Sequence, residues 1–214
     1  MTYLEIVNEI LVRLREPQVT TVTDNSYSSM IGKFVNDSKR QVEDAWNWDA
    51  LGTTVTGTTS ANVTNYLIVG SGIRQKGVNV NNTTSKNELI NVPIQWIINN
   101  QQLSTTTTGI PSYYAWNGTD GTDSKVEVYP TPNGVYTLKF NMYVSQAALS
   151  TGTDVLLVPS EPVILGAYAR ALVERGEDGG LTSSEAYALF KASLADHIGI
   201  EATRYIENEC WVAV

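Results

Sequence analysis

The feature that most constrains the fold of this chain is an abrupt change of composition near residue 51. Before that point, and again beyond Pro159, apolar residues recur at the spacing of one helix face. The stretch from Leu51 to Thr153 is instead dense in Thr, Asn, Gly and β-branched residues, and charged residues are sparse in it. The pattern predicts an α+β protein in which a β-rich domain interrupts a helical body.

Two helices are predicted before the insertion. Thr2 and Glu5 form a capping box at the start of the first, and Pro17 ends its apolar pattern. The apolar stripes are Leu4, Val7, Ile10, Leu11 and Leu14 in the first helix and Ile31, Phe34, Val35, Val42, Ala45 and Trp46 in the second. We expect the two helices to pack together, with Trp46 in the core and Trp48, which lies off the stripe, at an interface.

The clearest strand of the insertion is predicted over residues 136–144, where apolar and polar side chains alternate. Residues 125–129 are also strand-like, and the Pro-Thr-Pro-Asn-Gly sequence at 130–134 has the composition of a hairpin turn. The sequence therefore predicts that these two strands form an antiparallel pair. Weaker strands are predicted at 53–58, 66–69, 77–80 and 112–116, and residues 94–100 fit either a strand or a short helix.

Two more helices are predicted beyond Pro159. Gly176 is a suitable stop for the first, and Thr182 with Glu185 forms a capping box for the second. Their apolar stripes are Val163, Ile164, Ala167, Tyr168, Ala171 and Leu172, then Ala186, Phe190, Leu194 and Ile198. The predicted fold is a helical bundle body of two N-terminal and two C-terminal helices with an inserted antiparallel β-rich domain. The predicted boundaries are 1–50 and 156–206 for the body, 51–155 for the insertion and 207–214 for a tail.

The tail is apolar where chain ends are usually polar. Its residues are Glu207, Asn208, Glu209, Cys210, Trp211, Val212, Ala213 and Val214. A tryptophan is a frequent energetic hot spot of protein interfaces. We therefore interpret this tail as a docking segment anchored by Trp211.

Charge and cysteine content narrow the possible functions. The formal net charge is -8, from 22 acidic and 14 basic residues, so the composition indicates no basic face that could hold nucleic acid by its phosphates. A single cysteine, Cys210, excludes a disulfide framework within one chain and fits assembly in the reducing cytoplasm of a host. Neither a secretion signal nor an apolar run long enough for a membrane span is apparent, and we expect no membrane contact.

The sequence offers little for catalysis, and we expect no enzyme activity, no cofactor and no metal. The chain has one histidine, His197, and Cys210 has no second histidine to activate it. Hydrolysis by a pair of carboxylates is the hardest chemistry to exclude, because the two acids need no particular spacing in sequence. The acids considered are Glu88, Asp120, Asp123 and Glu127, of which Asp120 and Asp123 also fit a turn or a weak calcium loop.

Aromatic residues leave two interpretations open. Aromatic faces bind sugar rings, so the insertion fits a carbohydrate-binding module, but the same residues serve as core or interface anchors. The residues that we assign to a possible subunit or nozzle interface are Trp48, Tyr113, Tyr114 and Trp116.

Several short motifs carry a resemblance to a known family. They are Leu14-Arg15-Glu16-Pro17 at the end of the first helix, Ala45-Trp46-Asn47-Trp48 after the second, Gly109-Ile110-Pro111-Ser112-Tyr113-Tyr114, Val128-Tyr129-Pro130-Thr131-Pro132-Asn133, and 156–159 leading into Ala167-Tyr168-Ala169-Arg170-Ala171. In this order they resemble the head-to-tail adaptors, or tail tubular A-type connectors, of short-tailed phages. Each motif is short, and no catalytic motif is among them.

This resemblance implies a structural virion protein. It implies a ring, a dodecamer, between the portal protein and the tail nozzle (tail tubular B-like) protein, with DNA passing through the lumen during ejection without sequence-specific binding. The tail would then bind the portal. Two alternatives remain open from the residues: a carbohydrate-binding or peptidoglycan-degrading tail component, and a tail-completion or terminator protein, which forms a ring on a long tail tube.

Overall fold

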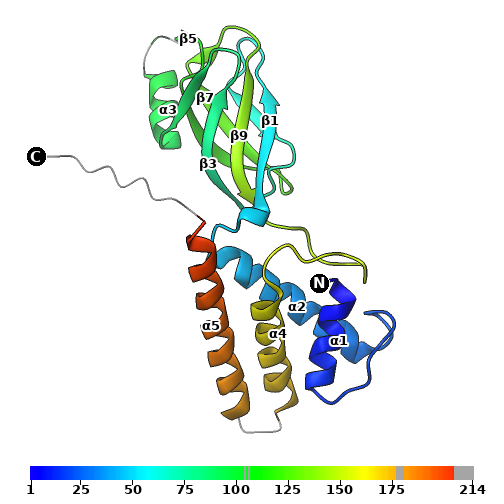
Figure 1. Cartoon of the computed structure of the whole chain (residues 1–214). Coiled ribbons are helices and arrows are strands. Elements are labelled where there is room, and N and C mark those ends of the chain that lie inside the picture. Colours follow the sequence, from blue (N-terminus) through cyan, green and yellow to red (C-terminus); the bar gives the residue numbers. More distant parts are fainter. Residues whose placement is uncertain (104, 106, 177–180, 205–214) are drawn as a thin grey trace, which may run out of the picture. The chain divides into compact units, whose positions relative to one another are not determined.

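The computed structural model describes residues 1–103, 105, 107–176 and 181–204. The chain divides into two compact units, a helical unit of Met1–Ala50 with Gln146–Val214 and a sheet unit of Leu51–Ser145. Five α-helices and one large sheet in the described ranges make this an α+β protein (Figure 1). None of the described helices is long and apolar enough to cross a membrane.

The helical unit contains α1 (Tyr3–Arg13), α2 (Ser26–Ala45), α4 (Ser160–Arg175) and α5 (Leu181–Ala202). Helix α4 packs against the other three, and α4 and α5 lie side by side (Figure 1). Ser38, Gly166 and Phe190 show how closely α2, α4 and α5 approach, because a Cβ on Gly166 would lie 3.1 Å from Ser38 Oγ and 3.2 Å from the Phe190 ring. The predicted capping box of Thr2 and Glu5 is confirmed, and Asn25 with Ser28 forms another at the start of α2.

The segment that returns from the sheet unit is fixed on α1 and α2. The side-chain amide of Asn36 exchanges two hydrogen bonds with the backbone of Leu149, at 2.8 and 3.0 Å. Lys39 Nζ donates to the carbonyl oxygen of Gln146 at 2.7 Å, and Tyr3 N donates to that of Asp154 at 2.8 Å. Because of these contacts residues 146–155 belong to the helical unit, whereas the sequence analysis placed them in the insertion.

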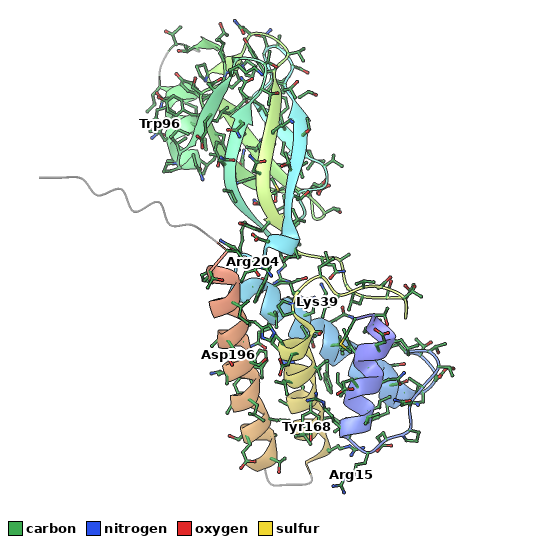
Figure 2. The ribbon with its side chains drawn as sticks, viewed as in Figure 1. Arg15, Lys39, Trp96, Tyr168, Asp196 and Arg204 are labelled. Atoms are coloured by element: carbon green, nitrogen blue, oxygen red, sulfur yellow. The ribbon has the colours of Figure 1, made fainter. Side chains whose placement is uncertain are left out.

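Lys39 and Glu43, one turn apart on α2, form a buried ion pair in this region. Their Nζ and Oε1 atoms lie 2.8 Å apart, and each side chain is no more than 3% exposed. Glu43 Oε1 also accepts the backbone N–H of Gln146 at 3.2 Å, so the pair binds both polar groups of that peptide segment. Figure 2 labels Lys39 at this position. Buried charges need such partners, because an isolated one is very costly.

In each of two loops beside α1, one aspartate accepts backbone N–H groups of the residues that precede it. Asp24 accepts the backbone N–H groups of Thr20 and Thr21, and Asp154 accepts those of Ser150 and Thr151, at 2.7 to 3.0 Å. The hydroxyl groups of Thr21 and Thr151 add a further hydrogen bond each. These bonds, led by the threonine hydroxyl, lower the pKa of both aspartates to about 2, because hydrogen bonds to a carboxylate favour its charged form.

The sheet unit is built on a seven-stranded sheet in the order β1-β9-β3-β4-β6-β7-β2. All neighbouring strands are antiparallel except β4 and β6, which are parallel. The strands are β1 (Gly52–Thr58), β2 (Asn65–Ile68), β3 (Gln75–Asn82), β4 (Asn87–Asn91), β6 (Tyr113–Thr119), β7 (Ser124–Tyr129) and β9 (Thr137–Val144), with β5 (Thr108–Gly109) and β8 (Thr131–Pro132) as a separate short pair. Helix α3 (Ile94–Gln102) packs on β6 and β7, which decides the ambiguity over 94–100 in favour of a helix.

The hairpin predicted between 125–129 and 136–144 is wrong, although both segments are strands. Strand β7 lies between β6 and β2, while β9 lies between β1 and β3. The segment that connects them makes its own contacts instead of a tight turn: β8 pairs with β5, and Thr59 Oγ1 bonds to Gly134 O and Tyr136 N. Both strands therefore pair with distant partners.

The sheet is nearly closed around an apolar core. The core residues are Ile68, Val80, Leu89, Tyr114, Val126, Val128, Leu138, Phe140 and Met142, and each is at most 3% exposed. The two edge strands, β1 and β2, approach each other at one point, where a Cβ on Gly57 would lie 3.3 Å from Ile68 Cδ1. They are the two ends of the strand order, so the sheet stays open between them.

Candidate interaction surfaces

The acids of the stretch at 117–123 stabilise the backbone. Asp120 Oδ1 accepts the N–H groups of Thr122 and Asp123 at 2.9 and 2.8 Å, and these backbone bonds lower the pKa of Asp120. Asp123 Oδ1 accepts those of Gly70 and Gly72 at 3.0 and 2.9 Å. The interpretation as a turn holds for 120–123, whereas 117–119 belong to β6. Asp123 ties the turn to the glycine-rich loop at 70–72.

The other two acids, Glu88 and Glu127, lie on different strands in unlike surroundings. Glu127 on β7 is buried and accepts Asn117 Nδ2 at 2.8 Å, whereas Glu88 on β4 is exposed. The two strands are separated by β6, and the register offsets the acids by four residues along the strands. Strand geometry puts their Cα atoms roughly 16 Å apart.

His197 on α5 has structural contacts. Its Nδ1 lies 2.8 Å from the carbonyl oxygen of Ser193, and its Nε2 lies 3.9 Å from the exposed Glu161 carboxylate. In the part of the chain that the structure describes, no group of three His, Cys, Asp or Glu side chains is arranged to hold a metal ion. Cys210 lies outside the described residues.

The two tryptophans after α2 are placed opposite to the expectation. Helix α2 ends at Ala45, and Trp46 is already extended (φ -150°) and half-buried. The chain then folds back, so that Trp48 is only 2% exposed and its Nε1 donates to the carbonyl oxygen of Val42 at 2.8 Å. Periodicity could not reveal this, because Trp48 satisfies an otherwise unpaired carbonyl of the last helical turn. Its ring belongs to the core of the helical unit.

The aromatic residues of the sheet unit form two groups. Tyr114, 3% exposed, packs with Trp116 in the sheet core, and Trp116 lies 6.0 Å from Phe140 between ring centroids. Tyr113 is half-buried and belongs to the second group, in which its ring centroid lies 4.9 Å from that of Trp96. The assignment of Tyr113, Tyr114 and Trp116 to an interface stays a prediction. Tyr113 and Trp116 are partly exposed, whereas Tyr114 is buried.

Trp96 is a surface residue that the sequence analysis missed. It lies on α3, and its ring contacts Tyr113 and Tyr129, the latter edge to face at 5.5 Å. It is 38% exposed, and Figure 2 labels it at α3. The ambiguity between helix and strand at 94–100 concealed this, because only the helix brings Trp96 over β6 and β7.

The outer face of α5 exposes several apolar residues. Its exposed residues are Ala188, Leu189, Ala192, Ala195, Gly199 and Ile200, with Leu189 and Ile200 each 60% exposed. Phe190 and Ala186 face the opposite way, into the core. Glu185, Lys191 and Asp196 are exposed charges on the same helix. Asp196 is turned away from α4 (Figure 2). A helix that is apolar on both sides is expected to be covered on both sides.

Charge is divided unequally between the two units. The helical unit has 18 acidic and 9 basic residues, a net charge of -9, and the sheet unit has 4 acidic and 5 basic residues, a net charge of +1. The net negative charge of the chain therefore resides in the helical unit. The predicted docking tail, residues 207–214, lies outside the described residues.

Comparison with known families places the chain among phage adaptors. The chain belongs to the SU10 adaptor protein family, a phage head-to-tail adaptor family whose model matches residues 1–206. This confirms the resemblance drawn from the short motifs. A comparison with curated proteins found no match. Membership is consistent with a structural role in the virion and favours a protein that is not an enzyme.

Proposed function

We propose that this chain forms a ring, a dodecamer, that joins the portal protein to the tail nozzle and lines the channel through which DNA is ejected. The observation that carries the proposal is the family match across both units. In this proposal α1, α2, α4 and α5 form the bundle that is the body of the ring. The ring is assembled in the host cytoplasm, and in the finished virion it lies in the part of the phage tail next to the portal.

A ring needs a heterologous interface, in which one surface of a subunit meets a different surface of its neighbour. The outer face of α5 supplies one of the two surfaces. It supports this role because it exposes the apolar side chains of Leu189 and Ile200, whereas the helical units repel one another through their charge of -9. Neighbours that meet through α5 bury apolar area and keep most of the acidic residues in solvent.

The same charge favours passage of DNA. A ring of acidic helical units repels a polyanion, so DNA slides through the lumen and is not held by sequence-specific contacts. Lys and Arg residues that could neutralise phosphates are a minority in this unit. The exposed aromatic pair of Trp96 and Tyr113 is our proposed contact with the nozzle protein, because partly exposed aromatic rings are frequent interface anchors.

The tail at 207–214 is proposed to bind the portal, and its deletion tests the adaptor function. Removing residues 208–214 is expected to lower the affinity for the portal ring by roughly thirtyfold or more, because an interface tryptophan is lost. Binding is measured by biolayer interferometry on immobilised portal. Glu209→Gln serves as the control that keeps Trp211, and circular dichroism checks that the helices are intact. Unchanged binding by the truncated chain overturns the portal role of the tail.

A further inference from the structure

The opening between β1 and β2 exposes two strand edges. Thr59 N donates to the carbonyl oxygen of Tyr136, so Thr59 is a hydrogen-bonded position of the β1–β9 pair. Such positions alternate along an antiparallel strand, so the backbone N–H and C=O groups of Thr54, Thr56 and Thr58 point away from β9. Val128 N donates to Thr64 O in the same way, so Leu67 turns its backbone groups away from β7. Unpaired edges of this kind are templates for an additional strand.

A pocket lies between these edges. It has a volume of about 220 Å³ and is lined by residues of both β1 and β2. Its floor is the apolar core of the sheet, reached at Val126, Leu138 and Phe140. An extended segment at this place would satisfy backbone groups of the edge and cover the opening with the side chains of one face.

The outer rim of the opening carries two lysines, with one acid, Glu127, the cross-strand partner of Asn65, two residues from Lys125. Lys125 is the cross-strand partner of Leu67, and Lys139 is the partner of Thr56, so one lysine stands behind each edge strand. Directly opposed residues share a face of the sheet, and Lys139 is exposed with Thr56. A segment that fits has apolar side chains at alternate positions for the floor and acidic side chains between them for the rim.

Residues 205–214 of the chain itself have this pattern. Alternate positions are Ile206, Asn208, Cys210, Val212 and Val214, which are apolar except for one asparagine. The intervening positions include Glu207 and Glu209, and the ten residues contain no lysine or arginine. Ile and Val also have high strand propensity.

We propose that residues 205–214 of one copy add as a strand in the β1–β2 opening of a second copy, with Glu207 and Glu209 toward Lys125 and Lys139. The proposal does not depend on the portal. A tail bound to the portal is not free for the opening, so the two proposals describe different states of the subunit, the docked state and the undocked one.

Cys210 permits a direct test in the full chain without portal, because it is the one cysteine. A benzophenone is attached to Cys210 of unlabelled protein, which is mixed with ¹⁵N-labelled protein and illuminated. Mass spectrometry then locates the adducts. The expected adducts join the tail of one isotope form to peptides containing residues 53–58 or 66–69 of the other.

Variants identify the cause of the crosslinking. Thr56→Pro removes an edge donor without breaking a bond to β9, and Lys125→Glu with Lys139→Glu reverses the rim charge. We expect each to reduce the adduct yield by roughly fivefold or more. Lys86→Glu, in the turn after β3, is a control for charge reversal away from the opening and should leave the yield unchanged. The lysine variants keep the test valid if Thr56→Pro does not fold.

Adducts on the helical unit, adducts only within one copy, or yields that ignore the rim charge overturn the proposal. Because portal is absent, a failure here leaves the portal-binding result unaffected, and a failure of portal binding leaves this one unaffected.

Discussion

Replacing Lys39 with methionine is expected to lower the free energy of unfolding of the helical unit by about 3–5 kcal/mol, because the change removes the ammonium group 2.8 Å from the buried carboxylate of Glu43. The carbonyl oxygen of Gln146 also loses its donor. Urea unfolding followed by circular dichroism at the helical band measures the effect. The loss is large because it is a desolvation cost and not merely a missing contact.

Two controls separate this explanation from a general effect of losing a lysine. Lys33→Met changes an exposed lysine of the same helix and should cost less than about 0.5 kcal/mol. The double change of Lys39→Met with Glu43→Leu removes both charges and should recover much of the stability. A Lys39→Met variant as stable as Lys33→Met contradicts the assignment of a buried ion pair that fixes the return segment.

Ring assembly should be lost when charge is placed on the outer face of α5. Leu189→Asp with Ile200→Asp is expected to raise the concentration needed for assembly by roughly a hundredfold or more, since two carboxylates would be buried without partners. Both side chains are 60% exposed in the single chain, so the fold itself should tolerate the change. Sedimentation velocity over a concentration series measures assembly.

Val135→Asp is the matched control for that experiment. Val135 is 70% exposed in the loop before β9 and lies on the sheet unit, far along the chain from α5. We expect this variant to assemble like the unchanged chain. Equal assembly by the α5 variant and the control shows that α5 is not at the subunit interface.

Helices were predictable from the sequence because their order is local. The stripes of Leu4 to Leu14 and of Ala186 to Ile198 reflect the 3.6-residue period, and the Thr2–Glu5 capping box gives the start of α1. Strand partners were not predictable. Segments 125–129 and 136–144 read as a hairpin, but their partners β6, β2, β1 and β3 are chosen by a closed apolar core formed from distant segments.

The candidate surfaces divide in the same way. The apolar character of α5 can be read from the sequence, yet which side of the helix remains exposed depends on packing against α4. Trp48 was expected at an interface and Trp96 was missed, because burial of Trp48 depends on a folded-back turn and exposure of Trp96 depends on a helix that packs on the sheet. Periodicity and charge did not indicate the family, which was predicted from the resemblance of the short motifs.

The most direct test of the adaptor function is to mix the purified chain with its cognate portal ring and weigh the product by mass photometry. The proposed function predicts a single heavier species, equal to the portal plus a complete ring of this chain, with electron microscopy showing the added layer on one end. Portal and chain that retain their separate masses at micromolar concentrations would contradict it.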